Sequence, residues 1–401
     1  MAQLTLAVIY GSRTCEHDVS VISALQCMDA AEKGGYRVVP VYISQEGLWY
    51  TGAPLRRIET YQGGFDAAAK GIQQVLLDVN ANSGELLAWP PAKGGLFAAR
   101  GKEVIAHIDV AMPVLHGLHG EDGTLQGLLE LANIPYTSSG VLGSAVGMDK
   151  IAMKMLCRGV GLPVVPDVWF LREAWLRDPD AQLDRVEAAF PYPVFVKPAN
   201  LGSSIGVSRA ADRDTLREAI EVAASFDRRI LVEAGLNAPI EVNCAVLGYG
   251  EAVRASVCEK PATGQEMLSY DDKYLHGGKG MASQQREIPA PIGEEKTAQA
   301  QRVSSEAFRA LDCKGVVRVD LMIDGQTGAL YINEINTIPG SLAFYLWAEE
   351  GMGYPALIEH MVECAFRAQA QKQHSVFAYR STILANYQKA GGTKGTKGTK
   401  I

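Results

Sequence analysis

Short apolar runs and helical patterns alternate along the first part of the chain. Residues 4–10 form a continuous apolar run that ends at Gly11, as expected of a strand buried on both faces. A helix is predicted over residues 18–32, and residues 36–44 are the next predicted strand. This order indicates a βαβ unit with parallel strands. The turn after the first strand reads Gly-Ser-Arg-Thr-Cys-Glu-His, so the Gly-x-Gly-x-x-Gly fingerprint of dinucleotide-binding proteins does not occur there.

The same patterns predict further elements as far as residue 372. Strands are expected over residues 105–115, 164–171, 193–197, 229–233 and 240–247, and helices over residues 124–132, 148–161, 178–189, 294–311 and 354–372. Residues 50–104 show no pattern that predicts an element. Residues 261–288 form a long polar loop of the kind that often acts as a lid over an active site.

A β-hairpin is predicted between residues 316 and 335, and it carries most of the candidate chemistry. Both arms alternate apolar and polar residues, and residues 324–328, Asp-Gly-Gln-Thr-Gly, supply the turn. If the two ends of that turn pair with each other, Arg318 lies opposite Glu334. Asp320 is then diagonal to Glu334, about 7–8 Å away between Cα atoms.

The hairpin is a candidate metal site. Asp320, Glu334 and Asn336 could bring two carboxylates and an amide oxygen to one divalent ion, and Mg²⁺ prefers such ligands together with substrate phosphates. The alternative is a surface hairpin whose charges are only solvated. The segment Glu-Ile-Asn-Thr-Ile-Pro-Gly is apolar in context, and burying a carboxylate without a partner costs several kcal/mol, which favours the metal site.

A second candidate site follows the predicted strand that ends at Lys197. The next residues, Pro-Ala-Asn-Leu-Gly-Ser-Ser-Ile-Gly-Val, offer backbone N–H groups and hydroxyls that can surround phosphate oxygens while the lysine supplies charge. The stretch is not a Walker A loop, since Gly-x-x-x-x-Gly-Lys-Ser/Thr does not occur. An ordinary flexible loop is the alternative.

Composition narrows the class of protein. The chain has 401 residues, 47% of them hydrophobic. A chain of this length is too long for one compact core, which predicts two or three domains. A net charge of −7 and the lack of a basic run argue against a nucleic-acid partner. No apolar run is long enough to span a membrane, and the N-terminus resembles a first strand rather than a signal peptide. Seven cysteines without a Cys-x-x-Cys motif predict free thiols in a reducing cytoplasm.

Five motifs occur in order between about residues 4 and 370. They are Cys15-Glu-His-Asp-Val-Ser, His116-Gly-Leu-His-Gly-Glu-Asp-Gly-Thr-Leu-Gln-Gly127, Met148-Asp-Lys, Lys197-Pro with Gly202-Ser-Ser-Ile-Gly206, and Arg318-Val-Asp with Glu334-Ile-Asn-Thr-Ile-Pro-Gly340. Together they resemble the D-alanine–D-alanine ligases of the ATP-grasp superfamily. One such motif would be weak support, but five in the family's order are specific.

The resemblance implies an α/β (α+β) fold with three domains in the ATP-grasp arrangement. Residues 1–138 would form the N-terminal βαβ substrate-binding domain, and residues 139–233 the central small domain. Residues 234–375 would form the C-terminal domain with the lid loop 261–288 and the metal hairpin. The tail, residues 376–401, ends in a Gly-Thr-Lys repeat that is expected to be disordered.

The resemblance also implies the reaction. Such ligases convert ATP and two D-alanine molecules to ADP, phosphate and D-alanyl-D-alanine for peptidoglycan, through an acylphosphate on the first D-alanine. The cofactors would be ATP and Mg²⁺, with Mn²⁺ as a substitute, and a homodimer is the usual assembly. Asp320, Glu334 and Asn336 resemble the metal ligands of the family.

The ATP site of the family maps onto both candidate segments. Lys150 and Lys197 resemble the lysines that grip the phosphates, and Lys273 resembles the lid lysine that reaches the γ-phosphate. Glu233 and Glu241 resemble the acids on the adenine and ribose sides, although Glu241 alone is also consistent with a solvated strand carboxylate. The complete set that the resemblance implies is Lys150, Lys197, Ser204, Glu233, Leu236, Glu241 and Lys273.

Catalytic roles follow from the same resemblance. Glu16 resembles the acid that pairs with the first substrate's ammonium, although an acid in the first turn of a helix also favours the helix dipole by itself. Ser203 and Tyr274 resemble the residues that, with Glu16, orient the lid and the substrates. Arg318 and the backbone N–H of Gly340 resemble the pair that stabilises an oxyanion.

Substrate binding is implied for His116, Ser341, Tyr345 and Leu346, and here the sequence departs from the family. Many members have a threonine and then a serine after Pro-Gly, and the serine holds the acceptor carboxylate, whereas this chain has Leu342 and Tyr345. We expect the hydroxyl of Tyr345 or Ser341 to replace it, with help from Arg318 and backbone N–H groups. The alternative is that Tyr345 packs in an apolar cluster. A second departure is the alanine after Glu233, where a lysine is frequent.

Two other functions fit parts of the pattern. A relative that joins D-alanine to D-lactate or D-serine would share most motifs, but Tyr274 in the lid favours a dipeptide product. A non-catalytic nucleotide-binding module would have no need of the metal ligands, which are all present.

Overall fold

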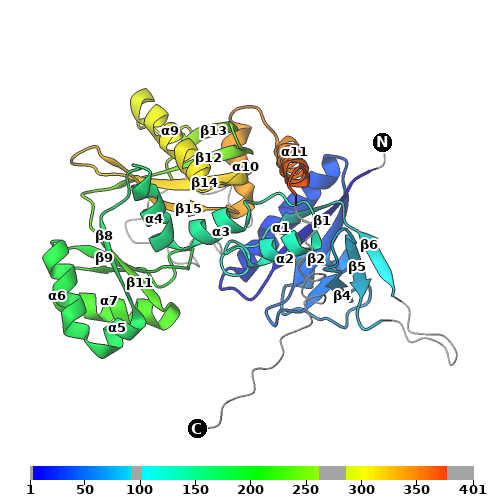
Figure 1. Cartoon of the computed structure of the whole chain (residues 1–401), viewed down its shortest axis with the longest axis horizontal. Helices are drawn as coiled ribbons and strands as arrows, with labels where there is room; N and C mark the ends of the chain where they lie inside the picture. The colour runs from blue at the N-terminus through cyan, green and yellow to red at the C-terminus, as the bar shows by residue number, and fades with distance from the viewer. Residues whose placement is uncertain (1–2, 92–101, 262–285, 377–401) are drawn as a thin grey trace, which may run out of the picture.

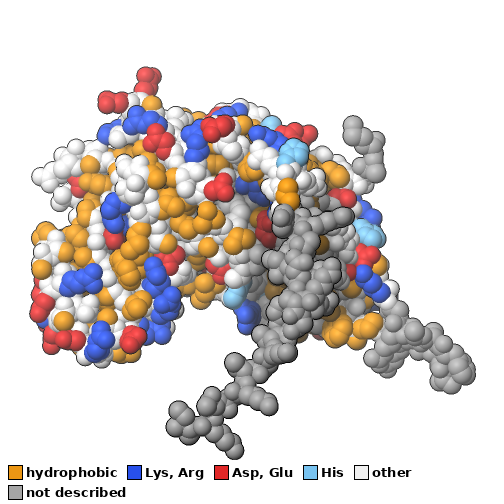
Figure 2. All heavy atoms as spheres, viewed as in Figure 1, with side chains coloured by type: hydrophobic (Ala, Val, Ile, Leu, Met, Phe, Trp, Pro, Cys, Tyr) orange, Lys and Arg blue, Asp and Glu red, His pale blue; other side chains and the backbone are white. Residues whose placement is uncertain are grey.

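The computed structural model describes residues 3–91, 102–261 and 286–376, which form three β-sheets and the helices around them (Figure 1). Lys273 and Tyr274, and most of the predicted lid and tail, lie outside the described residues. No helix in the described part of the chain is long and apolar enough to cross a membrane. On the face drawn in Figure 2, acidic and basic side chains are interspersed.

The first sheet has seven strands in the order β6-β5-β4-β3-β2-β1-β7. The strands are β1 (Thr5–Gly11), β2 (Arg37–Ile43), β3 (Trp49–Thr51), β4 (Gln73–Leu77), β5 (Glu85–Ala88), β6 (Val104–His107) and β7 (Val110–Pro113). β1 pairs in parallel with β2 and β7, and the helix α1 (His17–Lys33) connects β1 to β2, so the predicted βαβ unit is confirmed.

Residues 50–104, which show no sequence pattern, extend this sheet in antiparallel fashion. Their strands are three to five residues long, too short for a period to emerge. The single strand predicted over residues 105–115 is wrong, because the chain breaks there into β6 and β7. The predicted helix over residues 124–132 is α2 (Thr124–Ala132).

The second sheet has four antiparallel strands in the order β10-β9-β11-β8 and a core of its own. Its strands are β8 (Asp167–Leu171), β9 (Val194–Pro198), β10 (Ser208–Ala210) and β11 (Arg229–Ala234), and its helices are α5 (Arg172–Arg177), α6 (Pro179–Ala189) and α7 (Arg213–Phe226). Sequence reasoning missed α7, although a capping box of Asp212 and Thr215 marks its start.

The third sheet is antiparallel in the order β13-β12-β14-β15. Its strands are β12 (Ile240–Tyr249), β13 (Ala252–Glu259), β14 (Lys314–Ile323) and β15 (Leu330–Asn336). The helices around it are α3 (Val141–Met148), α4 (Lys150–Gly159), α9 (Glu294–Ala310), α10 (Phe344–Ala348) and α11 (Tyr354–Gln373). α9 covers one face (Figure 1), and α11 packs against β12 and β14. The domain limits expected from the sequence stay a prediction.

The hairpin β14–β15 differs from its predicted register. Asp320 lies directly opposite Glu334, and Arg318 lies opposite Asn336. The predicted pairing of Arg318 with Glu334 is wrong for two reasons. The turn closes one residue later than expected, with Asp324 N–H donating to Ala329 O at 2.8 Å, and a bulge adds one more residue to β15.

One apolar cluster joins the first and third sheets. It includes Tyr10 and Met28 from the N-terminal unit together with Val316, Trp347 and Met361 from the C-terminal unit. In Figure 1, α1 and α11 lie side by side at this contact. This shared core holds the loops after β1 and β7 close to the hairpin β14–β15 of the third sheet.

Candidate active site

A cavity of about 350 Å³ lies where the three units approach one another. Side chains from the second and third sheets and from the loops after β1 and β7 form its wall. The predicted site residues on that wall are Glu16, His116, Lys150, Lys197, Ser203, Ser204, Glu233, Leu236, Glu241, Arg318, Asp320, Glu334, Asn336, Gly340 and Tyr345. The structure therefore brings residues from the whole length of the chain to one place.

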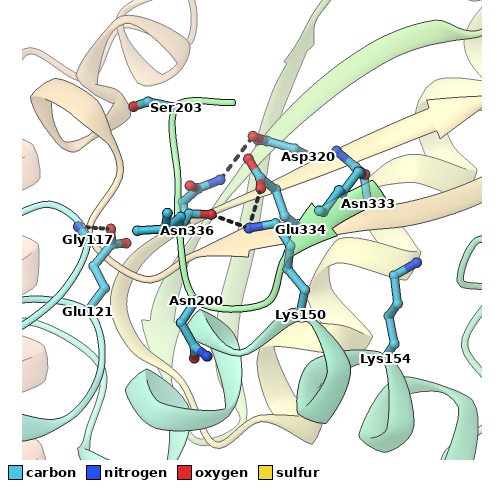
Figure 3. Close-up of polar contacts among 12 residues, drawn as sticks. Gly117, Glu121, Lys150, Lys154, Asn200, Ser203, Asp320, Asn333, Glu334 and Asn336 are labelled. Carbon is cyan, nitrogen blue, oxygen red and sulfur yellow. Dashed lines mark hydrogen bonds and ion pairs between the residues drawn. The ribbon is translucent and has the colours of Figure 1, made fainter. Parts of the chain in front are cut away.

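Asp320 and Glu334, two facing carboxylates of the hairpin, line the cavity (Figure 3). The two oxygens of Asp320 accept hydrogen bonds from Arg318 Nε at 2.6 Å and Nη2 at 2.7 Å. Asn336 Nδ2 donates to the same carboxylate at 2.9 Å. Burial raises the pKa of Asp320 to about 6, and the charge of Arg318 opposes that rise. Both carboxylates are hard oxygen donors on one face of the sheet.

This donor set fits a divalent ion that arrives with phosphate. In the described residues, no group of three His, Cys, Asp or Glu side chains could hold a metal on its own. Asp320 and Glu334 offer carboxylate oxygens, and Asn336 could add its amide oxygen. Since Mg²⁺ commonly binds through one or two carboxylates plus substrate phosphates, the remaining ligands would come from the nucleotide.

Two buried lysines face this pair from the second sheet and from α4. Lys150, the first residue of α4, lies 3.1 Å from Glu334 Oε2 and donates to Leu201 O at 2.6 Å. Lys197 at the end of β9 donates to Asn333 Oδ1 at 2.9 Å. Burial alone would raise the pKa of Glu334, but Lys150 and Lys197 lower it to about 2. Asn333 is the extra residue of the β15 bulge, so the bulge helps to position Lys197.

Lys154 is a residue of this cluster that sequence reasoning missed. It has no exposed surface, and it forms an ion pair with Glu233, whose other oxygen lies 2.6 Å from Lys197. Burial would raise the pKa of Glu233, but the two lysines lower it to about 2. Lys154 follows Lys150 by four residues, so both lie on one face of α4, and this spacing was the sequence signal for Lys154. Glu233 thus has both oxygens in contact with ammonium groups.

The N-terminal unit contributes an acid and a neutral histidine. Ser203 Oγ donates to Glu16, which joins the loop after β9 to the start of α1. His116 Nδ1 lies 2.9 Å from Ile338 O and therefore donates to it, while Nε2 lies 3.0 Å from Ser23 Oγ. Burial lowers the pKa of His116 to about 4, so the ring is neutral near pH 7.

Glu121 was not predicted, although it belongs to the motif that begins at His116. Its two oxygens accept the backbone N–H groups of Gly117 at 3.0 Å and Ile338 at 2.8 Å. Burial and the nearby Glu16 raise its pKa to about 8. Glu121 ties the loop after β7 to the segment that leads into Gly340.

The segment after Gly340 turns away from the cavity. Ser341, Leu342 and Ala343 have φ values of 48°, 53° and 50°, a left-handed turn that L-residues adopt only when packing enforces it. Ser341 Oγ donates to Gln26 Oε1 at 2.8 Å, and the Leu346 side chain is fully buried. Neither residue lines the cavity, and their role in substrate binding stays a prediction. Tyr345, by contrast, faces the cavity.

Tyr345 belongs to a polar wall that the sequence did not reveal. Its hydroxyl donates to Glu259 Oε1 at 2.9 Å, and Asn243 Nδ2 donates to the same oxygen at 2.8 Å. The guanidinium of Arg286 lies over the Tyr345 ring, 4.1 Å from its centre. This hydroxyl therefore has a carboxylate partner, and Tyr345 is not a member of a purely apolar cluster.

Another part of the cavity wall is more apolar. Val165, Phe195, Leu236 and Met322 line it, and Glu241 lies directly opposite Met322 on the third sheet. This part of the wall could hold a flat nucleobase between its apolar side chains, with the exposed acid Glu241 nearby.

The chain is similar to one family over most of its length. Residues 5–139 match the family described as "D-ala D-ala ligase N-terminus", and residues 156–363 match "D-ala D-ala ligase C-terminus". A D-alanine–D-alanine ligase of Acetivibrio thermocellus is 40% identical over 363 residues, 89% of this chain and 94% of that protein. One from Bacillus cytotoxicus is 38% identical over 377 residues, 93% and 98% of the two chains.

Solved structures agree in fold. The VanG D-Ala:D-Ser ligase from Enterococcus faecalis is 28% identical, with a TM-score of 0.76 over 91% of this chain and 100% of that one. The D-alanine–D-alanine ligase from Coxiella burnetii, at 24% identity, has a TM-score of 0.74 over 97% and 99% of the two chains. The predicted ATP-grasp fold is confirmed.

Proposed function

The chain belongs to the D-alanine–D-alanine ligase family, and we propose that its cavity joins two D-alanine molecules at the expense of ATP. It is an ATP-dependent ligase that forms D-alanyl-D-alanine for peptidoglycan precursors. The observation that carries the proposal is the facing pair Asp320 and Glu334 beside two buried lysines, since this arrangement suits a phosphate-bound cation.

Two bond-forming steps would take place in the cavity. A carboxylate oxygen of the first D-alanine attacks the γ-phosphorus of ATP, which forms an acylphosphate and releases ADP. The amine of the second D-alanine then attacks the acyl carbon, and the bond from that carbon to the phosphate oxygen breaks. Lys150 and Lys197 would hold the phosphate oxygens throughout, because both ammonium groups point at the hairpin.

The substrates need different partners. The first D-alanine carries an ammonium group, and Glu16, hydrogen-bonded to Ser203, is an acid on the cavity wall that can pair with it. The tetrahedral intermediate carries an oxyanion, and Arg318 and the Gly340 N–H lie on the same wall. The neutral His116 is held on both ring nitrogens and so acts as a fixed part of this wall.

A divalent ion completes the ATP site. When bound, it neutralises charge on the β- and γ-phosphate oxygens. We propose Mg²⁺, with Mn²⁺ as a substitute, held by Asp320, Glu334 and Asn336. We also propose a homodimer in the cytoplasm, where ATP is available. All seven cysteines are free, which agrees with a reducing compartment.

Product identity tests the proposal. The protein is incubated with ATP, Mg²⁺ and D-alanine, alone or with D-lactate, D-serine or L-alanine, and ADP release and product mass are measured. We expect ADP release that depends on D-alanine and a product with the mass of D-alanyl-D-alanine. A depsipeptide or D-alanyl-D-serine as the main product would assign the chain to a different ligase. ATP binding without any turnover would instead support a nucleotide-binding module.

A further inference from the structure

We propose that Arg286, held by Glu259 and Tyr345, binds the carboxylate of the acceptor amino acid. The proposal rests on the proposed ligase function and gives it an acceptor site that the sequence could not supply. In many relatives that the sequence resembles, a serine serves here, but this chain has a tyrosine at the corresponding position.

Arg286 is placed on the cavity wall by two contacts. Its guanidinium stacks on the Tyr345 ring at 4.1 Å from the ring centre, and Nη1 lies 3.5 Å from Glu259 Oε2. The side chain is 11% exposed, so it is mostly shielded yet reaches the cavity. Stacking on an aromatic ring fixes the plane of a guanidinium, which is the feature that makes arginine suited to carboxylates.

The other arginine of the cavity is already engaged. Arg318 directs two N–H groups to the two oxygens of Asp320 at 2.6 and 2.7 Å. Within the described residues, the Arg286 side chain makes one hydrogen bond, the long contact with Glu259. A guanidinium has five N–H donors, so Arg286 retains donors for a bidentate carboxylate contact.

Glu259 is the positioning residue of this wall. Its side chain is 3% exposed, and it accepts hydrogen bonds from Asn243 Nδ2 at 2.8 Å and Tyr345 Oη at 2.9 Å. A buried carboxylate with two neutral donors still requires a cation, and Arg286 provides it. Glu259 thereby orients both the ring and the guanidinium that stacks on it.

The position of this wall in the sheet fits an acceptor site. Glu259, Asn243, Asp320 and Glu334 lie opposite one another in turn, so they form one row across β13, β12, β14 and β15. Lys150 and Lys197 contact the β15 end of the row, which makes that end the phosphate side. The Arg286 wall is at the other end, with Asp320 between. An acceptor amine directed at the acyl carbon would leave its carboxylate toward Arg286.

Acceptor kinetics test the proposal. In Arg286→Met, which keeps an apolar stem over the ring, we expect the KM for the acceptor D-alanine to rise roughly ten- to a hundred-fold. The KM for the donor D-alanine should change by less than about two-fold, since Glu16 and Ser203 are unaltered. Arg286→Lys keeps the cation and should give an intermediate acceptor KM. It replaces the methionine variant if that variant has a lowered melting temperature.

Arg254 on β13 is a matched control, because its aromatic partner lies on the same helix, α10, as Tyr345. Arg254 also stacks on an aromatic ring of α10, 5.0 Å from the centre of Trp347, and lies 3.7 Å from Glu350, but it is not on the cavity wall. Arg254→Met should leave both KM values unchanged. Glu259→Gln should raise the acceptor KM while sparing the donor KM, a split that loss of fold would not produce.

A neutral acceptor gives the decisive comparison. D-Alaninamide lacks the carboxylate, so the wild-type protein should use it far less well than D-alanine, and Arg286→Met or Arg286→Lys should reduce that preference. An unchanged preference in both variants, or an unchanged acceptor KM, would overturn the proposal. If the wild-type protein forms no dipeptide at all, the proposed function fails instead, and the two failures are distinguishable.

Discussion

At the scale of residues, Asp320 and Glu334 face each other across two strands, within reach of two lysines and one arginine. The motif residues were predictable because short-range spacing places Arg318 with Asp320, and Glu334 with Asn336. The register was not, because neither the turn length nor the bulge at Asn333 leaves a clear trace in the sequence. Glu259 and Arg286 were missed because they are far apart in the sequence and meet only in the folded sheet.

Loss of either facing carboxylate should abolish most turnover. In Asp320→Ala and in Glu334→Ala, we expect kcat to fall at least about a hundred-fold, because a missing ligand removes charge stabilisation of several kcal/mol. Far-UV circular dichroism should stay as in the wild type. Glu295→Ala, an exposed acid on α9, is the control. Near-normal rates in both site variants would reject the metal assignment.

Lys314 should make stability depend on pH outside the active site. Its Nζ lies 3.9 Å from the centre of the Tyr136 ring. Burial lowers the pKa of Lys314 to about 8. Between about pH 8 and 10.4, the unfolded chain keeps a proton that the folded protein has lost, so this lysine makes stability increase with pH there. Lys314→Met should remove that increase.

Urea unfolding of the wild type and of Lys314→Met at several pH values from 7 to 11 gives the measurement. The methionine variant should gain most, relative to wild type, at the low end of that range. A difference between the two proteins that does not change with pH would contradict the buried, readily deprotonated lysine.

At the scale of elements, most helices were predicted well, with α7 as an exception, whereas the short strands were not. The helices α1, α2, α9 and α11 begin and end within about two residues of their predicted limits, because their apolar faces persist over several turns. β3, β4 and β5 were missed because three to five residues cannot establish a period. The turn after Gly340 was also unpredictable, since its left-handed residues are held by packing and not by glycine.

The stability of the protein should depend on the buried ion pair between Lys154 of α4 and Glu233. Lys154→Met leaves Glu233 paired only with Lys197, and removing one partner of a buried pair costs about 3 kcal/mol or more. Arg158→Met is the matched control on the same helix. Arg158 pairs with Asp167, but its side chain is 50% exposed, so the loss should be below about 1 kcal/mol. The free energy of unfolding is measured with urea. Equal decreases in the two variants would show that the buried pair of Lys154 stabilises the protein no more than the exposed pair of Arg158.

At the scale of the whole molecule, the cavity exists only because three units converge on it. The shared core of the first and third sheets was invisible in the sequence, since its N-terminal members end at Val114 and its C-terminal members begin only at Ala245. The nucleotide would lie between the second and third sheets, so binding should stabilise the complete protein.

ATP with Mg²⁺ should therefore raise the melting temperature. At a ligand concentration a hundred times the Kd, binding stabilises by about 2.7 kcal/mol. Lys197→Met should show a much smaller shift than the wild type, whereas Lys33→Met, an exposed lysine on α1, should keep the full shift. An undiminished shift in Lys197→Met would contradict the phosphate-binding role of that lysine.

The most direct test of the central claim follows the fate of oxygen. The protein is given ATP, Mg²⁺ and D-alanine labelled with ¹⁸O in both carboxylate oxygens, and the released phosphate is analysed by mass spectrometry. If the cavity makes an acylphosphate that an amine then attacks, one phosphate is released for each dipeptide formed, and that phosphate carries one ¹⁸O atom. Phosphate without ¹⁸O, released at the rate of ADP formation, would contradict the account.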